Sequence, residues 1–369
     1  MRVYTNPIGL LLLSFTALVA VALYREMNHR QVAVKKDRAM TEIYARGLYS
    51  CSYFDRQFQD YEYLLSTIAG EAALLYKAER IQNIEPHIYT IRDLKNPETA
   101  PPDFAYAPTF KKNISLDYVT FIYPNITDTP SPEYRSMMDV LSLLKDSLRA
   151  AVVNSLVPPP PKNADAATIN HIIRNVTKPT ISSVFAGFSN GLFILYPSRT
   201  DVSPNYDPRK RNWYINAAAS PRQAIWSKPY VDTGEFKDLV ITCSRAILDD
   251  YNQPIGVTGA DVSLSQLIST LCETGNSGKF VKNKFLVDES GNIIADSSGK
   301  LLASRNSNDE LEFRHFPYSK FLPKMWEHKN GWLFSEEDGV NYLYFYLEIE
   351  SLQWLYIERI DFDELLTYY

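Results

Sequence analysis

The feature that most constrains the fold is a stripe of apolar side chains that runs from Met40 to Tyr76 without a proline. Its members are Met40, Ile43, Tyr44, Gly47, Leu48, Cys51, Phe54, Phe58, Tyr61, Leu64, Leu65, Ile68, Ala72, Leu75 and Tyr76. Steps of three and four residues place them on one face of a helix. The pattern predicts one long stalk helix over residues 25–80, and a helix of more than forty residues is about 60 Å or more in length at 1.5 Å per residue. Two helices broken near Gly47 are the alternative.

An apolar segment precedes this stripe. Residues Pro7 to Tyr24 carry no charge and are followed at once by Arg25. Such a segment is just long enough to cross a bilayer, since a spanning helix needs about 20 residues. We interpret residues 1–24 as an uncleaved membrane anchor of a plasma (inner) membrane protein that crosses once, with its bulk periplasmic or extracellular. A cleaved signal peptide is the alternative, because Ala20-Val21-Ala22 has the small-x-small form of a cleavage site.

The next part of the chain has an irregular pattern. Residues Pro86 to Pro132 are rich in proline and predict loops and short strands. A helix is predicted from Glu133 to Leu156, because Ser131 suits an N-cap and Pro132 suits the first helical position. Residues Pro158 to Pro161 end it, since a run of prolines cannot continue a helix.

After Thr180 the pattern changes to β-structure. Asn190-Gly191 separates two short apolar runs and is a strong hairpin signal. A helix is predicted over Trp213 to Ala219. Two long strands are predicted over Leu239 to Ile247 and Ile255 to Val262, and they are expected to form an antiparallel pair. Ser263 is the expected cap of a helix that ends near Leu271.

A second and smaller unit of strands follows. Strands are predicted over Lys284 to Val287, Ile293 to Ala295, Trp332 to Phe334, Val340 to Ile349 and Leu352 to Ile360, with turns between them. An order of helix, large sheet unit and small sheet unit differs from the alternating pattern of an α/β enzyme. The fold class predicted is therefore α+β.

Composition excludes several function classes. The net charge of −5 and pI near 5.7 provide no overall basic field, so nucleic acid is not an expected partner. Three widely spaced cysteines exclude a disulfide framework, although a bridge between Cys243 and Cys272 stays open. The five histidines show no metal-ligand spacing, and no metal or other cofactor is expected.

One set of side chains is suited to hold a free amino acid by both charged ends. It consists of Tyr206, Arg211, Trp213, Tyr214, Tyr230 and Asp261. A guanidinium grips a carboxylate through two parallel hydrogen bonds, and an indole N–H adds a third. A carboxylate with tyrosine hydroxyls or ring faces receives an ammonium group. Packing in a β-rich core is the alternative interpretation of these aromatic residues.

This chain resembles the double Cache domains of bacterial chemoreceptors and sensor kinases, over about residues 25–365. The resemblance rests on the order of anchor, long helix and two sensor units, and on the spacing of the six candidate residues. It implies two PAS-like antiparallel-sheet modules, a membrane-distal one over residues 81–275 that binds ligand and a membrane-proximal one over residues 276–369. It also implies that Arg211 and Trp213 hold the α-carboxylate, that Tyr206, Tyr230 and Asp261 hold the α-ammonium, and that Tyr214 supports the wall.

The function predicted is therefore a membrane-anchored sensor of a free amino acid or related metabolite, for signal transduction or chemotaxis. A Cache protein that binds another metabolite or only a partner protein is the main alternative. An envelope enzyme is disfavoured, because the sequence shows no nucleophile elbow, phosphate loop or Cys/His pairing. The apolar stripe of the stalk helix is expected to pack on the later units or on a second copy of itself, as a homodimer. The family's output module does not follow the sensor units before Tyr369, so either the chain is a truncated product or it acts through a separate signalling partner.

Overall fold

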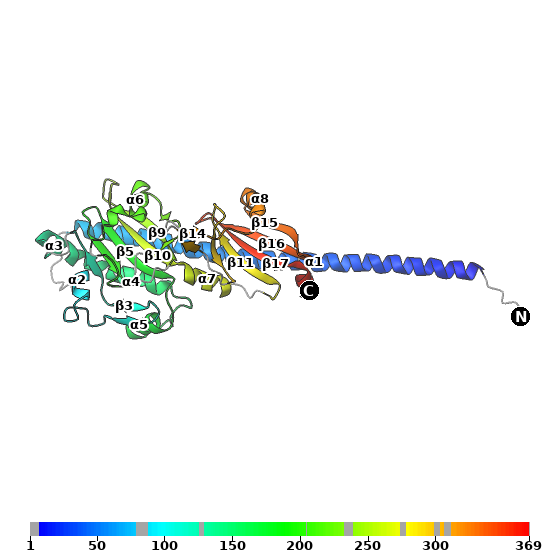
Figure 1. Ribbon diagram of the computed structural model, residues 1–369, viewed down its shortest axis with the longest axis horizontal. Helices are drawn as coiled ribbons and strands as arrows, with labels where there is room; N and C mark the ends of the chain where they lie inside the picture. The colour runs from blue at the N-terminus through cyan, green and yellow to red at the C-terminus, as the bar shows by residue number, and fades with distance from the viewer. Residues whose placement is uncertain are drawn as a thin grey trace.

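The computed structural model describes residues 7–78, 88–124, 129–203, 205–231, 239–273, 278–298, 303–305 and 311–368. For residues 7–21, 303–305 and 311 it describes the backbone alone. The chain is a mixed α and β protein in which a single long helix runs beside two mainly antiparallel sheets (Figure 1).

Helix α1 (Pro7–Lys77) is continuous, so the predicted long helix is confirmed and the alternative of a break near Gly47 is wrong. Most of its apolar stripe is buried, including Ile43, Phe54, Leu65 and Ala72, whereas Tyr44 and Leu48 of the same stripe are exposed. Residues 22–38, by contrast, are exposed, and Figure 1 shows this part of α1 projecting from the body. The C-terminal end of the described chain lies beside the point where α1 leaves the body (Figure 1). The buried part of α1 packs on both sheets.

Among the residues described, no helix is apolar enough over a sufficient length to cross a membrane. Residues 1–6 of the predicted anchor lie outside the described residues, as do the side chains of residues 7–21.

The large sheet, over the described part of the chain, has the strand order β1-β4-β6-β5-β10-β9-β7, with β8 also paired to β9. Its strands are β1 (Tyr89–Thr90), β4 (Thr120–Ile122), β5 (Ile181–Phe188), β6 (Phe193–Tyr196), β7 (Ile225–Trp226), β8 (Tyr230–Val231), β9 (Leu239–Leu248) and β10 (Pro254–Ser263). The predicted hairpin is confirmed, because β5 and β6 pair around Asn190 and Gly191. Gly191 has a φ of +91°, a conformation that glycine adopts without strain. The predicted β9–β10 pair is confirmed as well.

Short elements surround this sheet. They are α2 (Ile91–Leu94), β2 (Ala105–Ala107), β3 (Lys112–Ile114), α3 (Pro132–Leu141), the 3-10 turn η1 (Ser142–Leu144), α4 (Lys145–Asn154), α5 (Ala166–Asn175), the 3-10 turn η2 (Pro208–Lys210), α6 (Asn212–Ala219) and α7 (Leu264–Glu273). Ser131 caps α3 by accepting a hydrogen bond from the Tyr134 amide, as predicted. The predicted helical stretch from Glu133 to Leu156 is confirmed over residues 132–154, where α3, η1 and α4 follow one another without a break. The Ser142 hydroxyl donates to the Asp139 carbonyl at 2.7 Å, a local bond that competes with the helical ladder where the 3-10 turn begins.

The small sheet has the order β12-β11-β17-β16-β15 in the described residues. Its strands are β11 (Val281–Val287), β12 (Ile293–Asp296), β15 (Asn330–Glu337), β16 (Val340–Ile349) and β17 (Trp354–Asp361), and they confirm the strands predicted in this part of the chain. The elements around it are β13 (Ala303–Arg305), β14 (Leu311–Phe313), the 3-10 turn η3 (Ser319–Phe321), α8 (Leu322–His328) and α9 (Phe362–Tyr368).

One buried core joins α1 to both sheets. It includes Phe58 of α1, Phe185 of the large sheet and Tyr356 of the small sheet.

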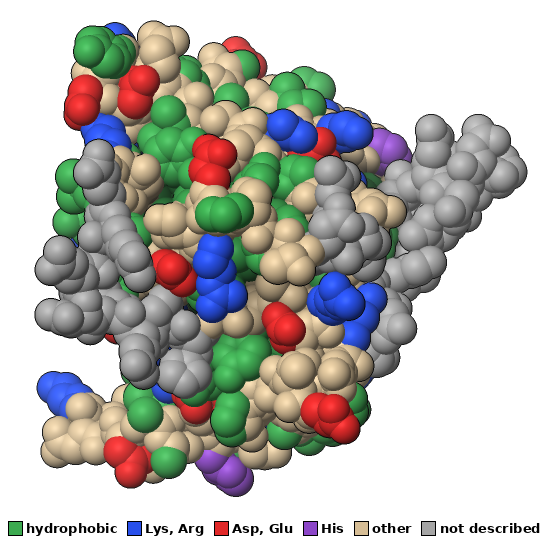
Figure 2. All heavy atoms as spheres, turned by 90° about the vertical axis from the view of Figure 1, so that its left-hand side faces the viewer, with side chains coloured by type: hydrophobic (Ala, Val, Ile, Leu, Met, Phe, Trp, Pro, Cys, Tyr) green, Lys and Arg blue, Asp and Glu red, His purple; other side chains and the backbone are tan. Residues whose placement is uncertain are grey.

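The bridge left open between Cys243 and Cys272 does not form, since both thiols are free; Cys243 is buried in β9, whereas Cys272 is exposed near the end of α7. At the end of the molecule remote from the projecting helix, Lys and Arg side chains are interspersed with Asp and Glu on the described surface (Figure 2).

Candidate ligand-binding site

The site is built around the carboxylate of Asp261, which is 3% exposed on β10. Its two oxygens accept hydrogen bonds from the hydroxyls of Thr242 at 2.7 Å, Ser183 at 2.9 Å and Tyr230 at 3.2 Å. The register between β10 and β5 shifts between Asp261 and Val262, and such a bulge changes the direction of neighbouring side chains. Flanking strands therefore hold a buried carboxylate in place with hydroxyl donors.

Tyr230 reaches this carboxylate from the opposite edge of β9. Strand β8 pairs Tyr230 with Val240, and the Tyr230 and Thr242 hydroxyls lie 2.6 Å apart. Asp261, Thr242 and Tyr230 thus form one connected polar cluster. Because Tyr230 is partly exposed, this cluster is connected to the protein surface.

The opposite wall comes from the segment that leads into α6. Trp213, 5% exposed, donates its indole N–H to the Tyr206 hydroxyl at 3.2 Å. The Arg211 guanidinium carbon lies 5.8 Å from the centre of the Tyr206 ring. This wall packs closely on β5, because a Cβ on Gly187 would lie 2.6 Å from Pro208 and 3.2 Å from the Trp213 ring.

Five of the six predicted residues line one small cavity, namely Tyr206, Arg211, Trp213, Tyr230 and Asp261. Tyr214 does not line it. Its ring meets Trp213 edge-on at 5.7 Å, and burial raises the pKa of its hydroxyl, against the opposing effect of Arg209.

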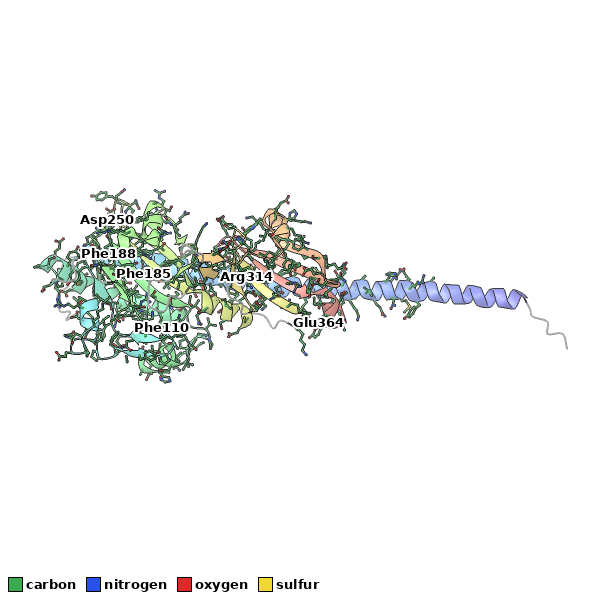
Figure 3. All side chains as sticks on the ribbon, in the orientation of Figure 1. Phe110, Phe185, Phe188, Asp250, Arg314 and Glu364 are labelled. Carbon is green, nitrogen blue, oxygen red and sulfur yellow. The ribbon has the colours of Figure 1, made fainter. Side chains whose placement is uncertain are left out.

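The rest of the cavity wall lies outside the six predicted residues. The additional lining residues are Phe185, Phe193, Leu195, Arg199 and Val202. The Phe185 ring packs at 4.8 Å from the Trp213 ring, and Figure 3 shows Phe185 within the large-sheet part of the molecule, away from Arg314 of the small-sheet part. Alternation along β5 and β6 was the signal for the apolar members, because their strands were predicted correctly.

Arg199 brings a second guanidinium to this cavity. It is 5% exposed, and its Nε lies 3.0 Å from the Asp201 carboxylate, which also pairs with Lys112 at 2.5 Å. Burial raises the pKa of Asp201, but Arg199 and Lys112 lower it by more, so that its pKa lies below the ordinary value. Asp201 thus stays ionised and holds Arg199 at the cavity wall.

The inner cavity adjoins a wider groove. The inner cavity measures about 20 Å³, which is room for about one water molecule. The groove measures about 690 Å³ and shares Arg211, Trp213 and Tyr230 with it. Its remaining wall includes Lys210, Asn216, Trp226, Ser227 and Lys228. Volumes of roughly 300–1,000 Å³ are typical of small-molecule sites. Three residues therefore face both the outer groove and the inner polar cluster.

Among the described residues, no group of three or more His, Cys, Asp or Glu side chains is arranged to hold a metal ion. The chemistry that the site offers is a guanidinium and an indole N–H with the Tyr206 hydroxyl on one side, and a carboxylate with the Tyr230 hydroxyl on the other. These groups bind charges of opposite sign.

Comparison with known proteins gives a family match over residues 125–368, to the Cache domain of the dCache_1 type. Among curated relatives, methyl-accepting chemotaxis protein McpC of Bacillus subtilis is 36% identical over 124 residues, which cover 32% of this chain and 18% of McpC. Methyl-accepting chemotaxis protein PctB of Pseudomonas aeruginosa is 31% identical over 115 residues, which cover 31% of this chain and 17% of PctB. The chain therefore spans less than a fifth of the length of these two relatives.

Solved structures of chemoreceptor sensor domains are also similar. The sensory domain of a Campylobacter jejuni chemoreceptor with isoleucine bound has a TM-score of 0.49 at 15% identity, and the match covers 91% of this chain and 97% of that one. The ligand-binding domain of the Pseudomonas fluorescens chemoreceptor CtaA with L-leucine has a TM-score of 0.35 at 22% identity, and the match covers 50% of this chain and 73% of that one.

Proposed function

This chain belongs to the Cache domain family, and from that premise we propose that it is the sensor region of a chemoreceptor-type protein that binds a free α-amino acid between Arg211 and Asp261. The observation that carries the proposal is that groups of opposite charge, Arg211 and Asp261, line the same cavity beside the Trp213 indole. The curated relatives are chemotaxis proteins, which supports a role in signalling.

The ligand's two charged ends would have different partners. Arg211 and Trp213 face both groove and cavity, so a carboxylate in the groove would reach the guanidinium and the indole N–H. The indole would then exchange its 3.2 Å bond to Tyr206 for a charged acceptor. An ammonium group would meet the Tyr230 hydroxyl and then the Asp261 carboxylate. Since the inner cavity holds about one water, the ligand side chain would remain in the 690 Å³ groove.

A setting at a membrane is part of the proposal. The apolar segment over residues 7–24 would anchor α1, and the two sheets would lie on the periplasmic or extracellular side. Ligand binding would act on the receptor only as far as the ligand prefers one conformation over another.

A thermal-shift screen of the purified chain against the twenty L-amino acids and their decarboxylated analogues tests the proposal. An amino acid at a hundred times its Kd should stabilise the chain by about 2.7 kcal/mol. We expect Arg211→Ala to abolish this shift and Arg211→Lys to reduce it, because lysine keeps the charge but loses the two parallel hydrogen bonds. Arg222→Ala is the matched control, since Arg222 is exposed and lines neither the cavity nor the groove.

The decarboxylated analogues should give no shift. Equal shifts for an amino acid and its amine, or an unchanged shift in Arg211→Ala, would contradict the proposal. A well-folded wild-type chain that responds to none of the twenty would contradict it as well.

A further inference from the structure

We propose that Trp226 is a further residue of the binding site, and that Glu62 of helix α1 acts as its positioning residue. On this proposal the long helix sets the shape of the groove, and an amino acid in the groove in turn alters the free energy of the contact with α1. The proposal rests on the function proposed above for what occupies the groove. The contact between the groove wall and α1 stands independently of it.

Trp226 belongs to two places at once. It lines the groove together with Trp213 and Tyr230. Its indole Nε1 donates to the Glu62 carboxylate at 2.8 Å, across 164 residues of sequence. A hydrogen bond to an ionised acceptor is about twice as strong as one between neutral groups. The hydrogen bond between the Trp226 and Glu62 side chains therefore attaches the groove wall to α1, in addition to the backbone pairing within the sheet.

The strand that carries Trp226 is short. Strand β7 has two residues and pairs only through Ile225 with Ser244 and Trp226 with Cys243 in the described part of the sheet. A strand this short at the end of a sheet contributes few backbone hydrogen bonds. Hydrogen bonds from Ser244 to the Ile225 carbonyl and between Ser227 and Thr242 hold its backbone to β9. The side-chain contacts of Trp226 then fix the orientation of its ring.

The same ring also packs against α1. The Phe58 ring, fully buried, meets Trp226 edge-on at 5.2 Å and an angle of 81°. Phe58 in turn lies 6.4 Å from Trp354 of the small sheet at 73°. Edge-on aromatic pairs add about 0.5–1.5 kcal/mol to simple burial in other proteins. Trp226, Phe58 and Trp354, which we call the aromatic bridge, connect the groove wall through α1 to the second sheet.

The groove wall is connected to the inner polar cluster as well. The Ser227 hydroxyl accepts a hydrogen bond from the Thr242 amide at 2.9 Å, and the Ser227 amide donates to the Thr242 carbonyl at 2.8 Å. The Thr242 hydroxyl donates to Asp261 at 2.7 Å. A displacement of the residues around Trp226 would therefore shift Thr242 and, through its hydroxyl, the position of the Asp261 carboxylate.

A second bond between α1 and the surroundings of the large sheet provides a matched control. The Ser147 hydroxyl of α4 donates to the Glu71 carboxylate. Neither Ser147 nor Glu71 lines the groove or the cavity. Loss of this bond should weaken the attachment of α1 without altering the binding site, which distinguishes a positioning role from a merely structural one.

The test is a double-mutant cycle on binding, with the L-amino acid of largest thermal shift as the probe. Trp226→Phe removes the indole donor but keeps an aromatic ring, and Glu62→Ala removes the acceptor. Each should weaken binding by about fivefold or more, a typical coupling between sites. The double variant should be no weaker than either single one, because both remove the same bond. Glu62→Gln, which keeps a neutral acceptor, should recover part of the affinity.

Glu71→Ala should leave the Kd within twofold. An unchanged Kd in Glu62→Ala, fully additive effects in the double variant, or an equal loss in Glu71→Ala would overturn the proposal.

Hydrogen exchange without any added amino acid tests the contact independently of ligand identity. We expect amide exchange over residues 225–231 to be faster than in the wild-type chain in Glu62→Ala and Trp226→Phe, and to be unchanged in Glu71→Ala. If no amino acid binds the wild-type chain but this result holds, the proposed ligand class is wrong while the positioning of the groove by α1 stands. Unchanged exchange at residues 225–231 in Glu62→Ala would overturn the positioning role itself.

Discussion

At the scale of single residues, Asp261 combines burial with charge. Hydroxyl groups of Ser183, Thr242 and Tyr230 stabilise its carboxylate through hydrogen bonds but do not neutralise it. A carboxylate removed from water is costly unless its environment compensates for the lost hydration. Proteins keep such groups where function requires them, often at the expense of stability.

We therefore expect Asp261→Asn to separate stability from binding. The amide has nearly the same shape but no charge, so the Tm of the unliganded chain should stay within a few degrees or rise. The thermal shift with amino acids should disappear, since the ammonium loses its charged partner. Differential scanning fluorimetry with and without the amino acid mixture measures both. A large fall in Tm with an intact ligand shift would show that Asp261 is a structural residue.

Half of the cavity lining was predictable, because the guanidinium of Arg211, the indole of Trp213 and the carboxylate of Asp261 together offer the groups that a zwitterion requires. Arg199 was not, because the sequence does not show that Asp201 and Lys112 would hold it beside the cavity. Tyr214 follows Trp213 directly on α6, and neighbouring residues of a helix point in different directions. The prediction that Tyr214 supports the wall stays a prediction, with an edge-on contact to Trp213 as its basis.

At the scale of elements, α1 meets the small sheet at a glycine. A Cβ on Gly47 would lie 1.9 Å from the Phe345 ring, which is fully buried on β16. The sequence shows Gly47 as a weak point in a helical pattern, because glycine costs about 1 kcal/mol relative to alanine. The structure shows the opposite role, since the missing side chain makes space for Phe345.

Two alanine substitutions on the same helix test this role. Gly47→Ala should destabilise the chain by about 1–3 kcal/mol, because the added methyl overfills the contact with Phe345. Gly70→Ala should stabilise it by about 0.5–1 kcal/mol, because a Cβ there meets nothing within 4 Å. Urea denaturation of both variants measures the difference. Equal effects of the two substitutions would contradict the close approach of α1 to β16.

Long periodic elements were predicted better than short ones. Helix α1 and the strands β9, β10 and β16 repeat their patterns over many residues, which leaves little ambiguity. Helices α5 and α8 were missed, and each has ten residues or fewer. Asp165 is the N-cap of helix α5, and its side chain accepts a hydrogen bond from the Thr168 amide at 2.7 Å, but an aspartate after a proline-rich run is equally typical of a loop. Tertiary contacts, which the sequence does not show, determine whether such a short segment forms a helix or a loop.

At the scale of the whole molecule, α1 belongs to the cores of both sheets. The Arg46 guanidinium of α1 pairs with the fully buried Glu358 of β17 at 2.6 Å. Glu358 also accepts a hydrogen bond from the Tyr356 hydroxyl at 2.6 Å. Farther along the same helix, Phe58 and Leu65 enter the core that includes the large sheet. Unfolding of either sheet should therefore remove part of the packing surface of the other.

From this shared helix we predict a single cooperative thermal transition. Arg46→Ala removes the guanidinium partner of the buried Glu358 carboxylate, which keeps the Tyr356 hydroxyl and its cross-strand neighbour Lys284. Loss of one partner of a buried acceptor typically costs about 1–3 kcal/mol, and it should move the whole transition to lower temperature. Lys77→Ala is the control on the same helix, because its pair with the largely exposed Asp250 should contribute less than about 1 kcal/mol. Differential scanning calorimetry measures both. Two resolved transitions, of which Arg46→Ala shifts only one, would mean that the sheets unfold independently and that α1 does not couple them.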